Sequence, residues 1–334
     1  MILNNLSKKE RLELYQVAYD TLGFSTIVIE KDWWVTAVLR ALFTLPYAEN
    51  LSFKGGTSLS KCYNLIERFS EDIDIAVYRD FLGFGGTLSK TQIKDKLRRA
   101  ACSFTREKLQ VDLQNQLETN GLNPSDFSVK VNITPITTTD PEIIEVEYQS
   151  LFKEVSYIKR KVIVEVSGRS MREPLQLVKL QSLMDVVFPN EDFTEPPFEI
   201  NAVMPERTFW EKICLLHEEF AKPPELIRSE RMSRHLYDLE KMMDTPIAEN
   251  ALKDKRLYDS IVEHRRIFVG LKGFDYNTLA VKIIKIVPPE NIIAQWQEDY
   301  ELLQHTMIYG ESLSFIKLID RIKQLNERIN QIDW

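Results

Sequence analysis

The stretch SFKGGTSLSKCYNLIERFSEDIDIAVYRD, residues 52–80, combines two adjacent glycines with two aspartates one residue apart. Residues two apart on a strand point to the same side, so Asp72 and Asp74 in the alternating run DIDIAVY are expected to share one face of a sheet. Two neighbouring carboxylates repel each other unless a positive charge lies between them. A divalent cation such as Mg²⁺ or Mn²⁺, which takes oxygen ligands and substrate phosphates, supplies that charge.

The glycines precede the aspartates at a position that suits a phosphate. Gly55 and Gly56 separate an expected strand, residues 50–53, from an expected helix, residues 58–68, which Thr57 or Ser58 would cap. Glycine lets the backbone approach an anion closely, and the start of a helix carries free N–H groups. A bare D-x-D is most often a pair of surface acids. The glycine loop and the aspartates in this order indicate a phosphate-and-metal site.

The composition of the whole chain is typical of a globular protein. The 334 residues are 44% hydrophobic, and the net charge of −7 argues against a globally basic nucleic-acid-binding protein. Three widely spaced cysteines without a C-x-x-C pair fit a reducing cytoplasm better than a disulfide framework. The most apolar run is too short to span a bilayer, and the N-terminus lacks an apolar signal core. We therefore expect neither a membrane segment nor a targeting segment.

The spacing of the apolar residues predicts an α+β protein with two domains. Residues 1–195 would contain N-terminal helices, a mixed sheet and flanking helices, and residues 196–334 would form a helical bundle. The turn-rich segment 190–205 marks the boundary. The predicted elements of the first domain are helices at 5–22, 30–45 and 89–120 and strands at 72–78, 127–133, 143–152 and 161–168.

The opening stretch resembles the DNA polymerase β-like nucleotidyltransferases, in which a glycine-led helix start is followed by D-x-[DE] on a strand. More narrowly, it resembles the AbiEii/AbiGii toxin family, whose glycine loop leads to an Arg-x-Ser-x-Asp-hydrophobic-Asp run. The matching residues here are Gly55, Gly56, Thr57, Arg68, Ser70, Asp72 and Asp74. The resemblance covers most of the chain, including EKDWWVTAVLRAL near the start and QEDYELLQ near the end. It is weakest over residues 80–160.

The superfamily usually has a third carboxylate on a neighbouring strand. Glu165 in KVIVEVSG is our candidate, because this strand is the more apolar one and is expected to lie nearer the centre of the sheet. Glu145 and Glu147 in IIEVEYQ are the alternatives. With Asp72 and Asp74, the third carboxylate would hold two metal ions.

Two motifs in the helical domain also match the family. Lys212 in RTFWEK lies beside an apolar stripe, and by itself it would be interpreted as a lysine that extends to solvent. Asp238 in SRHLYDLEKM would by itself form a surface ion pair with Arg234, four residues earlier. The resemblance implies that Lys212 faces the nucleotide and that Asp238 lies in the active site. It also implies nucleotide contacts for Lys54, Gly55, Gly56, Thr57, Ser58, Arg68 and Ser70. We assign no role to the four isolated histidines.

By resemblance, the chain would be a cytoplasmic, monomeric toxin of a bacterial toxin–antitoxin system, of the kind used in abortive infection and phage defence. A cognate antitoxin encoded beside it would neutralise it. The enzyme would transfer NMP from NTP to an RNA acceptor, the 3′ end of tRNA, using two metal ions. Basic helices at 90–108 and 222–241 would contact RNA phosphates, unless they are simply solvated surfaces.

Three other functions remain open. The acceptor could be a protein hydroxyl, as in AMPylation, because the active site would be the same. The chain could also be a module that binds NTP or antitoxin with little turnover. A metal-dependent nuclease is disfavoured by the glycine loop and Lys212, because a nuclease has no triphosphate to hold.

Overall fold

The computed structural model describes residues 2–70, 72–132, 141–153, 159–170 and 173–334. The chain divides into two compact units, Met1–Cys62 with Glu71–Val203, and Tyr63–Ser70 with Met204–Trp334. The division falls after residue 203 rather than at 195, because a strand between these positions completes the sheet of the first unit. The short segment Tyr63–Ser70 was not expected to belong with the helical unit.

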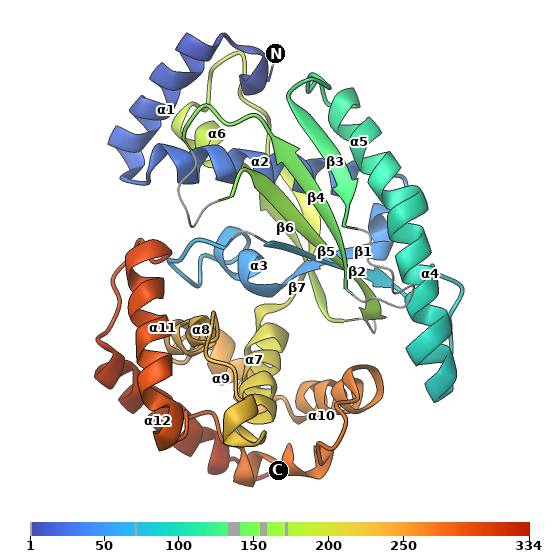
Figure 1. The fold of residues 1–334 in the computed structure, drawn as a ribbon, viewed down its shortest axis with the longest axis vertical. Coiled ribbons are helices and arrows are strands. Elements are labelled where there is room, and N and C mark those ends of the chain that lie inside the picture. The colour runs from blue at the N-terminus through green and yellow to red at the C-terminus, as the bar shows by residue number, and fades with distance from the viewer. Residues whose placement is uncertain (1, 71, 133–140, 154–158, 171–172) are drawn as a thin grey trace. The chain divides into compact units, whose positions relative to one another are not determined.

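The first unit is built on a mixed sheet. Seven strands of the described residues form it in the order β3-β4-β5-β2-β1-β7-β6. The pairs β2–β5 and β1–β7 are parallel, whereas the other neighbours are antiparallel. The strands, coloured blue to yellow in Figure 1, are β1 Leu51–Lys54, β2 Asp72–Tyr78, β3 Phe127–Val131, β4 Glu142–Tyr148, β5 Lys161–Ser170, β6 Leu175–Leu180 and β7 Phe198–Val203.

Alternation predicted most of these strands but missed two. Strands β2 to β5 confirm the strands expected from the apolar pattern. β6 was not predicted, and β7 was missed because the prolines and acidic residues before it led us to interpret 190–205 as turns. Yet the run FEINAV does alternate: Glu199 is exposed, whereas Ile200 and Ala202 are buried. That alternation was the signal for β7.

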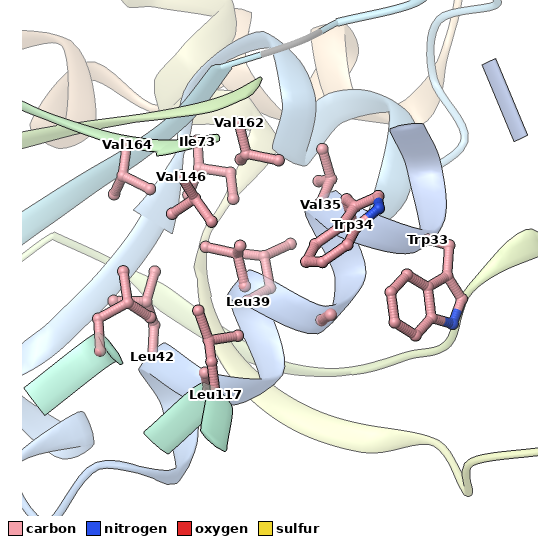
Figure 2. Close-up of a cluster of buried hydrophobic side chains, with 14 of the residues drawn as sticks. Trp33, Trp34, Val35, Leu39, Leu42, Ile73, Leu117, Val146, Val162 and Val164 are labelled. Carbon is pink, nitrogen blue, oxygen red and sulfur yellow. The ribbon is translucent and has the colours of Figure 1, made fainter. Parts of the chain in front are cut away.

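Together with α5 (Gln110–Thr119), one long helix covers one face of the sheet. α2 (Thr26–Thr44) begins after Ser25, whose hydroxyl accepts a hydrogen bond from the Val28 amide, as expected for an N-cap. Figure 2 shows the side chains of α2 against the inner strands, and this cluster includes Trp34, Leu39, Leu42, Ile73, Leu117, Val146, Val162 and Val164. Because α2 fills this face with apolar side chains, polar groups on β2 that alternate with Ile73 point to the other face.

The described part of this unit contains five further α-helices of 5 to 15 residues. They are α1 Lys8–Leu22, α3 Gly55–Lys61, α4 Arg98–Ser103, α5 Gln110–Thr119 and α6 Leu183–Val187, with π-helical turns at Gln92–Leu97 and Phe104–Leu109. The prediction that the helix after the glycines runs to Arg68 is wrong. α3 ends at Lys61, and the following residues pair instead with a segment of the helical unit.

The second unit is nearly all helical, as expected. Its helices are α7 Pro205–Phe220, α8 Ser233–Met242, α9 Pro246–Lys253, α10 Lys255–His264, α11 Ile293–Thr306 and α12 Phe315–Asn330. The apolar pattern predicted a single helix over residues 251–269, but Asp254 interrupts it and caps α10 by accepting a hydrogen bond from the Leu257 amide. In the part of the chain that the structure describes, no helix is both long and apolar enough to cross a membrane.

Candidate active site

The glycine loop lies directly against one carboxylate of the aspartate pair. β1 ends at Lys54, which is opposite Asp74 in the antiparallel register with β2, and Gly55 starts α3. Gly55 has φ +79°, and a Cβ added to it would lie 1.8 Å from Oδ2 of Asp74. Only glycine avoids both the backbone strain and this overlap. The glycine at this position therefore brings the loop backbone and the carboxylate into contact.

The three predicted carboxylates share the face of the sheet that α2 leaves uncovered. Asp72 and Asp74 alternate with Ile73 and Ile75, which are fully buried. In the parallel register between β2 and β5, Asp74 lies opposite Glu165. Residues opposite each other on adjacent strands project to the same side. The structure thus places Glu165 beside the aspartate that the glycine loop contacts.

Glu145 and Glu147, the alternatives for the third carboxylate, lie on the same face of β4 but have other partners. They are opposite Ile163 and Lys161 of β5, which separates their strand from β2. Lys161 Nζ is 2.6 Å from a Glu145 carboxylate oxygen. The hydrogen bond from Lys130 Nζ to Glu147, at 2.5 Å, lowers the pKa of Glu147. Both carboxylates are therefore neutralised by lysines within the sheet, and neither is opposite Asp74.

The carboxylates fit a metal ion that arrives with a nucleotide. Across the described ranges, no set of three or more His, Cys, Asp or Glu side chains is arranged to hold a metal ion by itself. Mg²⁺, however, is usually bound by one or two carboxylates together with substrate phosphates and water. Asp72 and Asp74, which are half-buried on one face, match that donor set. Glu165 is the nearest further carboxylate by register.

The hydroxyls of the glycine loop hold the loop in place. Thr57 Oγ1 donates a hydrogen bond of 2.5 Å to the carbonyl of Asp72, and Ser58 Oγ donates one of 2.9 Å to the carbonyl of Gly55. Both residues are buried, whereas Lys54 and Gly56 are half-buried. Thr57 does not cap α3, because the N-cap position is Lys54. The bond from Thr57 ties the start of α3 to the strand that carries both aspartates.

The second unit contains a buried cluster of charges that includes the other predicted site residues. Arg68 binds both carboxylate oxygens of Asp238, at 2.6 and 2.8 Å, and Lys212 Nζ lies 2.7 Å from Oδ2 of the same carboxylate. Asp238 is 0% exposed, Arg68 3% and Lys212 7%. Burial alone would raise the pKa of Asp238, but the charges and hydrogen bonds of Arg68 and Lys212 hold it well below its usual range. Asp238 is thus an ionised carboxylate between two cations.

His235, which received no role from the sequence, contacts the lysine of this cluster. Its Nδ1 is 3.4 Å from Lys212 Nζ. Burial, and then the positive charges of Lys212 and Arg234, lower the pKa of His235 well below its usual value, so the neutral ring accepts this contact. Burial also lowers the pKa of Lys212, and Arg68 adds to this while Asp238 opposes it. The i, i+3 spacing of His235 and Asp238 on α8 was the signal in the sequence.

Arg68 reaches Asp238 because its segment pairs with the chain after α11. Arg68 and Ile308 form an antiparallel bridge, and the Phe69 amide donates to the Met307 carbonyl at 2.7 Å. The Tyr309 amide donates to the carbonyl of Glu67 at 3.0 Å. Ser70, at the end of this segment, is half-buried. The Arg-x-Ser part of the motif is therefore ordered by the helical unit.

Comparison with known families finds a match that covers most of the chain. Residues 37–325 match the family described as nucleotidyl transferase AbiEii toxin, type IV TA system. No curated protein matches the chain. The matched region contains the glycine loop, the three carboxylates and the Arg68–Asp238–Lys212 cluster. The chain therefore belongs to the AbiEii nucleotidyltransferase toxin family of type IV toxin–antitoxin systems.

Proposed function

We propose that this toxin transfers a nucleoside monophosphate from an NTP to the 3′ end of an RNA acceptor, with tRNA as the expected acceptor. The observation that carries the proposal is the contact of Gly55 with Asp74, with Glu165 opposite on β5. Family membership supports a transferase that uses NTP and has an antitoxin partner. We further propose a polymerase β-like architecture for the first unit, a helical bundle for the second, and a monomer that acts in the cytoplasm.

The residues of the first unit would hold the reacting phosphates and their metal ions. Asp72 and Asp74 would bind both ions of a two-metal site, and Glu165 would bind the ion nearer the acceptor. Bound there, Mg²⁺ or Mn²⁺ would neutralise charge on the attacking and leaving oxygens. Gly55 to Ser58 would contact the phosphates through the backbone. The acceptor oxygen forms its bond to the α-phosphorus, the bond to the pyrophosphate oxygen breaks, and the hydroxyl proton passes to solvent.

The contacts of the Lys212 ammonium support a role for this lysine in binding the triphosphate. Nζ of Lys212 lies 2.7 Å from Oδ2 of Asp238 and 3.4 Å from Nδ1 of His235. A lysine ammonium carries three N–H donors, so these two contacts leave one donor for an anion. We propose that Asp238 and His235 orient the Lys212 ammonium, and that its remaining N–H binds a phosphate oxygen. Arg68 would hold Asp238 in position.

A basic stretch on the first unit supports RNA as the acceptor. Lys90, Lys94, Lys96 and Arg99 are exposed, and none of the four forms an ion pair with another residue of the described chain. Cations arranged along one helical stretch bind the phosphates of a nucleic acid in a salt-dependent way. A protein acceptor would not require such a stretch.

The decisive experiment offers each α-³²P-labelled NTP with Mg²⁺ to total tRNA and to lysate protein. We expect label on tRNA with the wild type, and a loss of about 100-fold or more in Asp74→Asn, since a lost ligand weakens metal binding and its neighbour cannot replace it. Glu147→Gln is the matched control. It removes another carboxylate from the same face of the sheet, and that carboxylate already binds Lys130.

The same labelling experiment also distinguishes the alternative functions. Label on protein alone would replace the RNA acceptor by a protein hydroxyl. NTP binding without label in any lane would indicate a binding module. A well-folded Asp74→Asn protein with wild-type activity would refute the site. Glu165→Gln, compared with Glu145→Gln and Glu147→Gln, then shows which glutamate is the third carboxylate, and we expect the loss in Glu165→Gln alone.

A further inference from the structure

Three consecutive charged residues on α2 are withdrawn from solvent and bind three different parts of the first unit. Glu30 is 2% exposed and accepts hydrogen bonds from the Leu151 amide, at 2.8 Å, and from the Ser150 hydroxyl. Lys31 is 1% exposed and donates to the backbone carbonyls of Lys159 and Lys161. Each contact joins α2 to a distant segment. Charged side chains are rarely buried unless they are paired, so these contacts account for the burial of Glu30 and Lys31.

The third residue, Asp32, binds the helix of the glycine loop. One of its carboxylate oxygens forms an ion pair with Lys61 Nζ at the end of α3. The other accepts a hydrogen bond of 2.8 Å from the Leu183 amide at the start of α6. The side chains of Asp32 and Lys61 are 12% and 11% exposed. Because α6 holds the second oxygen, the carboxylate is oriented independently of Lys61.

α3 needs such an external contact. It has seven residues, and a helix of this length is not stable by itself in water. Its first turn is tied to β2 by the hydrogen bond from Thr57 to the Asp72 carbonyl. Its last residue, Lys61, is bound by Asp32, and one residue later the chain leaves the first unit. The Lys61–Asp32 contact is therefore at the end of α3, where the chain passes into the segment that pairs with the helical unit.

Small movements of α3 matter at its other end. The Gly55 backbone fits so closely to Asp74 that a Cβ there would lie 1.8 Å from the carboxylate oxygen. A displacement of about 1 Å at a reacting centre can lower activity about 100-fold. A contact that prevents α3 from shifting therefore also fixes the glycine loop against Asp74.

We propose that Asp32 and Lys61 form a positioning pair that holds the glycine loop in register with the aspartates of β2. Neither side chain need touch the nucleotide. This inference rests on the proposed function, because it assigns the pair to the same site. It also gives the EKD run near the N-terminus a role that the transfer chemistry itself does not require.

The test compares Asp32→Asn, Lys61→Met and the double variant in the full-length protein, with Glu30→Gln as the matched control. Glu30 is a buried carboxylate on the same helix, but it binds residues 150 and 151 rather than α3. We expect each single change to lower kcat/KM for the NTP about 10-fold, as supporting residues around a site typically do. The double variant should be no worse than the single variants, and Glu30→Gln should keep wild-type kcat/KM even if it melts at a lower temperature.

Hydrogen exchange provides a second readout that does not depend on turnover. The peptide covering residues 55–62 should exchange faster in Asp32→Asn and in Lys61→Met, but not in Glu30→Gln, because only the first two remove the contact at the end of α3. Lys61→Arg keeps the charge. When Asp32 is present, this variant should show most of the wild-type protection of the peptide, and combined with Asp32→Asn it should show little.

These readouts separate the possible failures. Unchanged exchange and unchanged kcat/KM in Asp32→Asn, with only a lower Tm, would reduce the pair to a structural contact and overturn the proposal. Losses that multiply in the double variant, or a loss confined to Lys61→Met, would show that Lys61 contacts the substrate directly, which also overturns it. Faster exchange of α3 together with an inactive wild type would leave the pair as the anchor of α3 and refute the proposed function instead.

Discussion

Replacing Gly55 by alanine tests the closest contact of the candidate site. At φ +79° an alanine is strained by about 1–2 kcal/mol. Its Cβ would also lie 1.8 Å from Asp74 Oδ2 and 2.7 Å from Cγ, whereas carbon and oxygen normally stay about 3.3 Å apart. The carboxylate or the loop must therefore move by roughly 1.5 Å, the difference between these two separations.

A shift of this size should affect activity more than stability. A displacement of about 1 Å can lower the rate about 100-fold, which corresponds to about 2.7 kcal/mol of transition-state stabilisation. We therefore expect Gly55→Ala to lose at least about 100-fold in kcat/KM for NMP transfer, measured with α-³²P-labelled NTP, while the protein remains folded by circular dichroism.

Gly23 provides a matched control for the backbone strain. It has φ +75° at the C-terminal end of α1, and a Cβ there would have no neighbour within 4 Å. Gly23→Ala should therefore show the strain in its Tm without a loss of activity. If Gly55→Ala transfers nucleotide at the wild-type rate and is destabilised no more than Gly23→Ala, the contact between the glycine loop and Asp74 has no part in the reaction.

Three further predictions concern the second unit. Asp238→Asn should destabilise the protein by about 3–5 kcal/mol in urea unfolding, since it removes the carboxylate that binds both Arg68 and Lys212 in a buried place, and an unchanged midpoint would refute this. The folded-state pKa of Asp238 is lowered, so its contribution to stability is present above its unfolded value of about 3.9 and is lost as the pH falls through the folded-state pKa. In acid unfolding experiments below the unfolded-state pKa, the wild type should therefore lose more stability than Asp238→Asn. Gly310→Ala would place a Cβ 2.3 Å from Glu67 Oε2 and 2.5 Å from Glu67 Cβ, so we expect a lower Tm and weaker NTP binding, with equilibrium binding at wild-type affinity as the contrary result.

Local patterns in the sequence were sufficient to predict the strand that carries the two aspartates. Alternation in DIDIAVY predicted β2 and the shared face of Asp72 and Asp74, because side chains on a strand alternate regardless of what covers them. The same rule predicted β5, and the apolar character of that strand placed Glu165 near the middle of the sheet. The two strands are indeed neighbours, with Asp74 opposite Glu165.

The same rules failed where a segment is stabilised by distant partners. The pattern of residues 58–68 is compatible with a helix, yet α3 stops at Lys61 and the chain pairs with residues 307–310. Strand pairing over such a separation leaves no periodic signal in the sequence. β7 was missed for a related reason, because its short run follows a turn-rich segment and acquires its strand partners, β1 and β6, only in the folded sheet.

The sequence by itself determined the family, the mixed sheet with its helices, and the residue types of the candidate site, because these depend on local spacing and on motifs. Only the tertiary structure decided which charges meet. It joined Asp238 to Arg68, 170 residues away, and to Lys212, instead of leaving the aspartate as one half of a surface pair with Arg234. It also joined Asp32 to Lys61. Buried charges need partners that compensate for lost hydration, and the chain can bring those partners together only by folding.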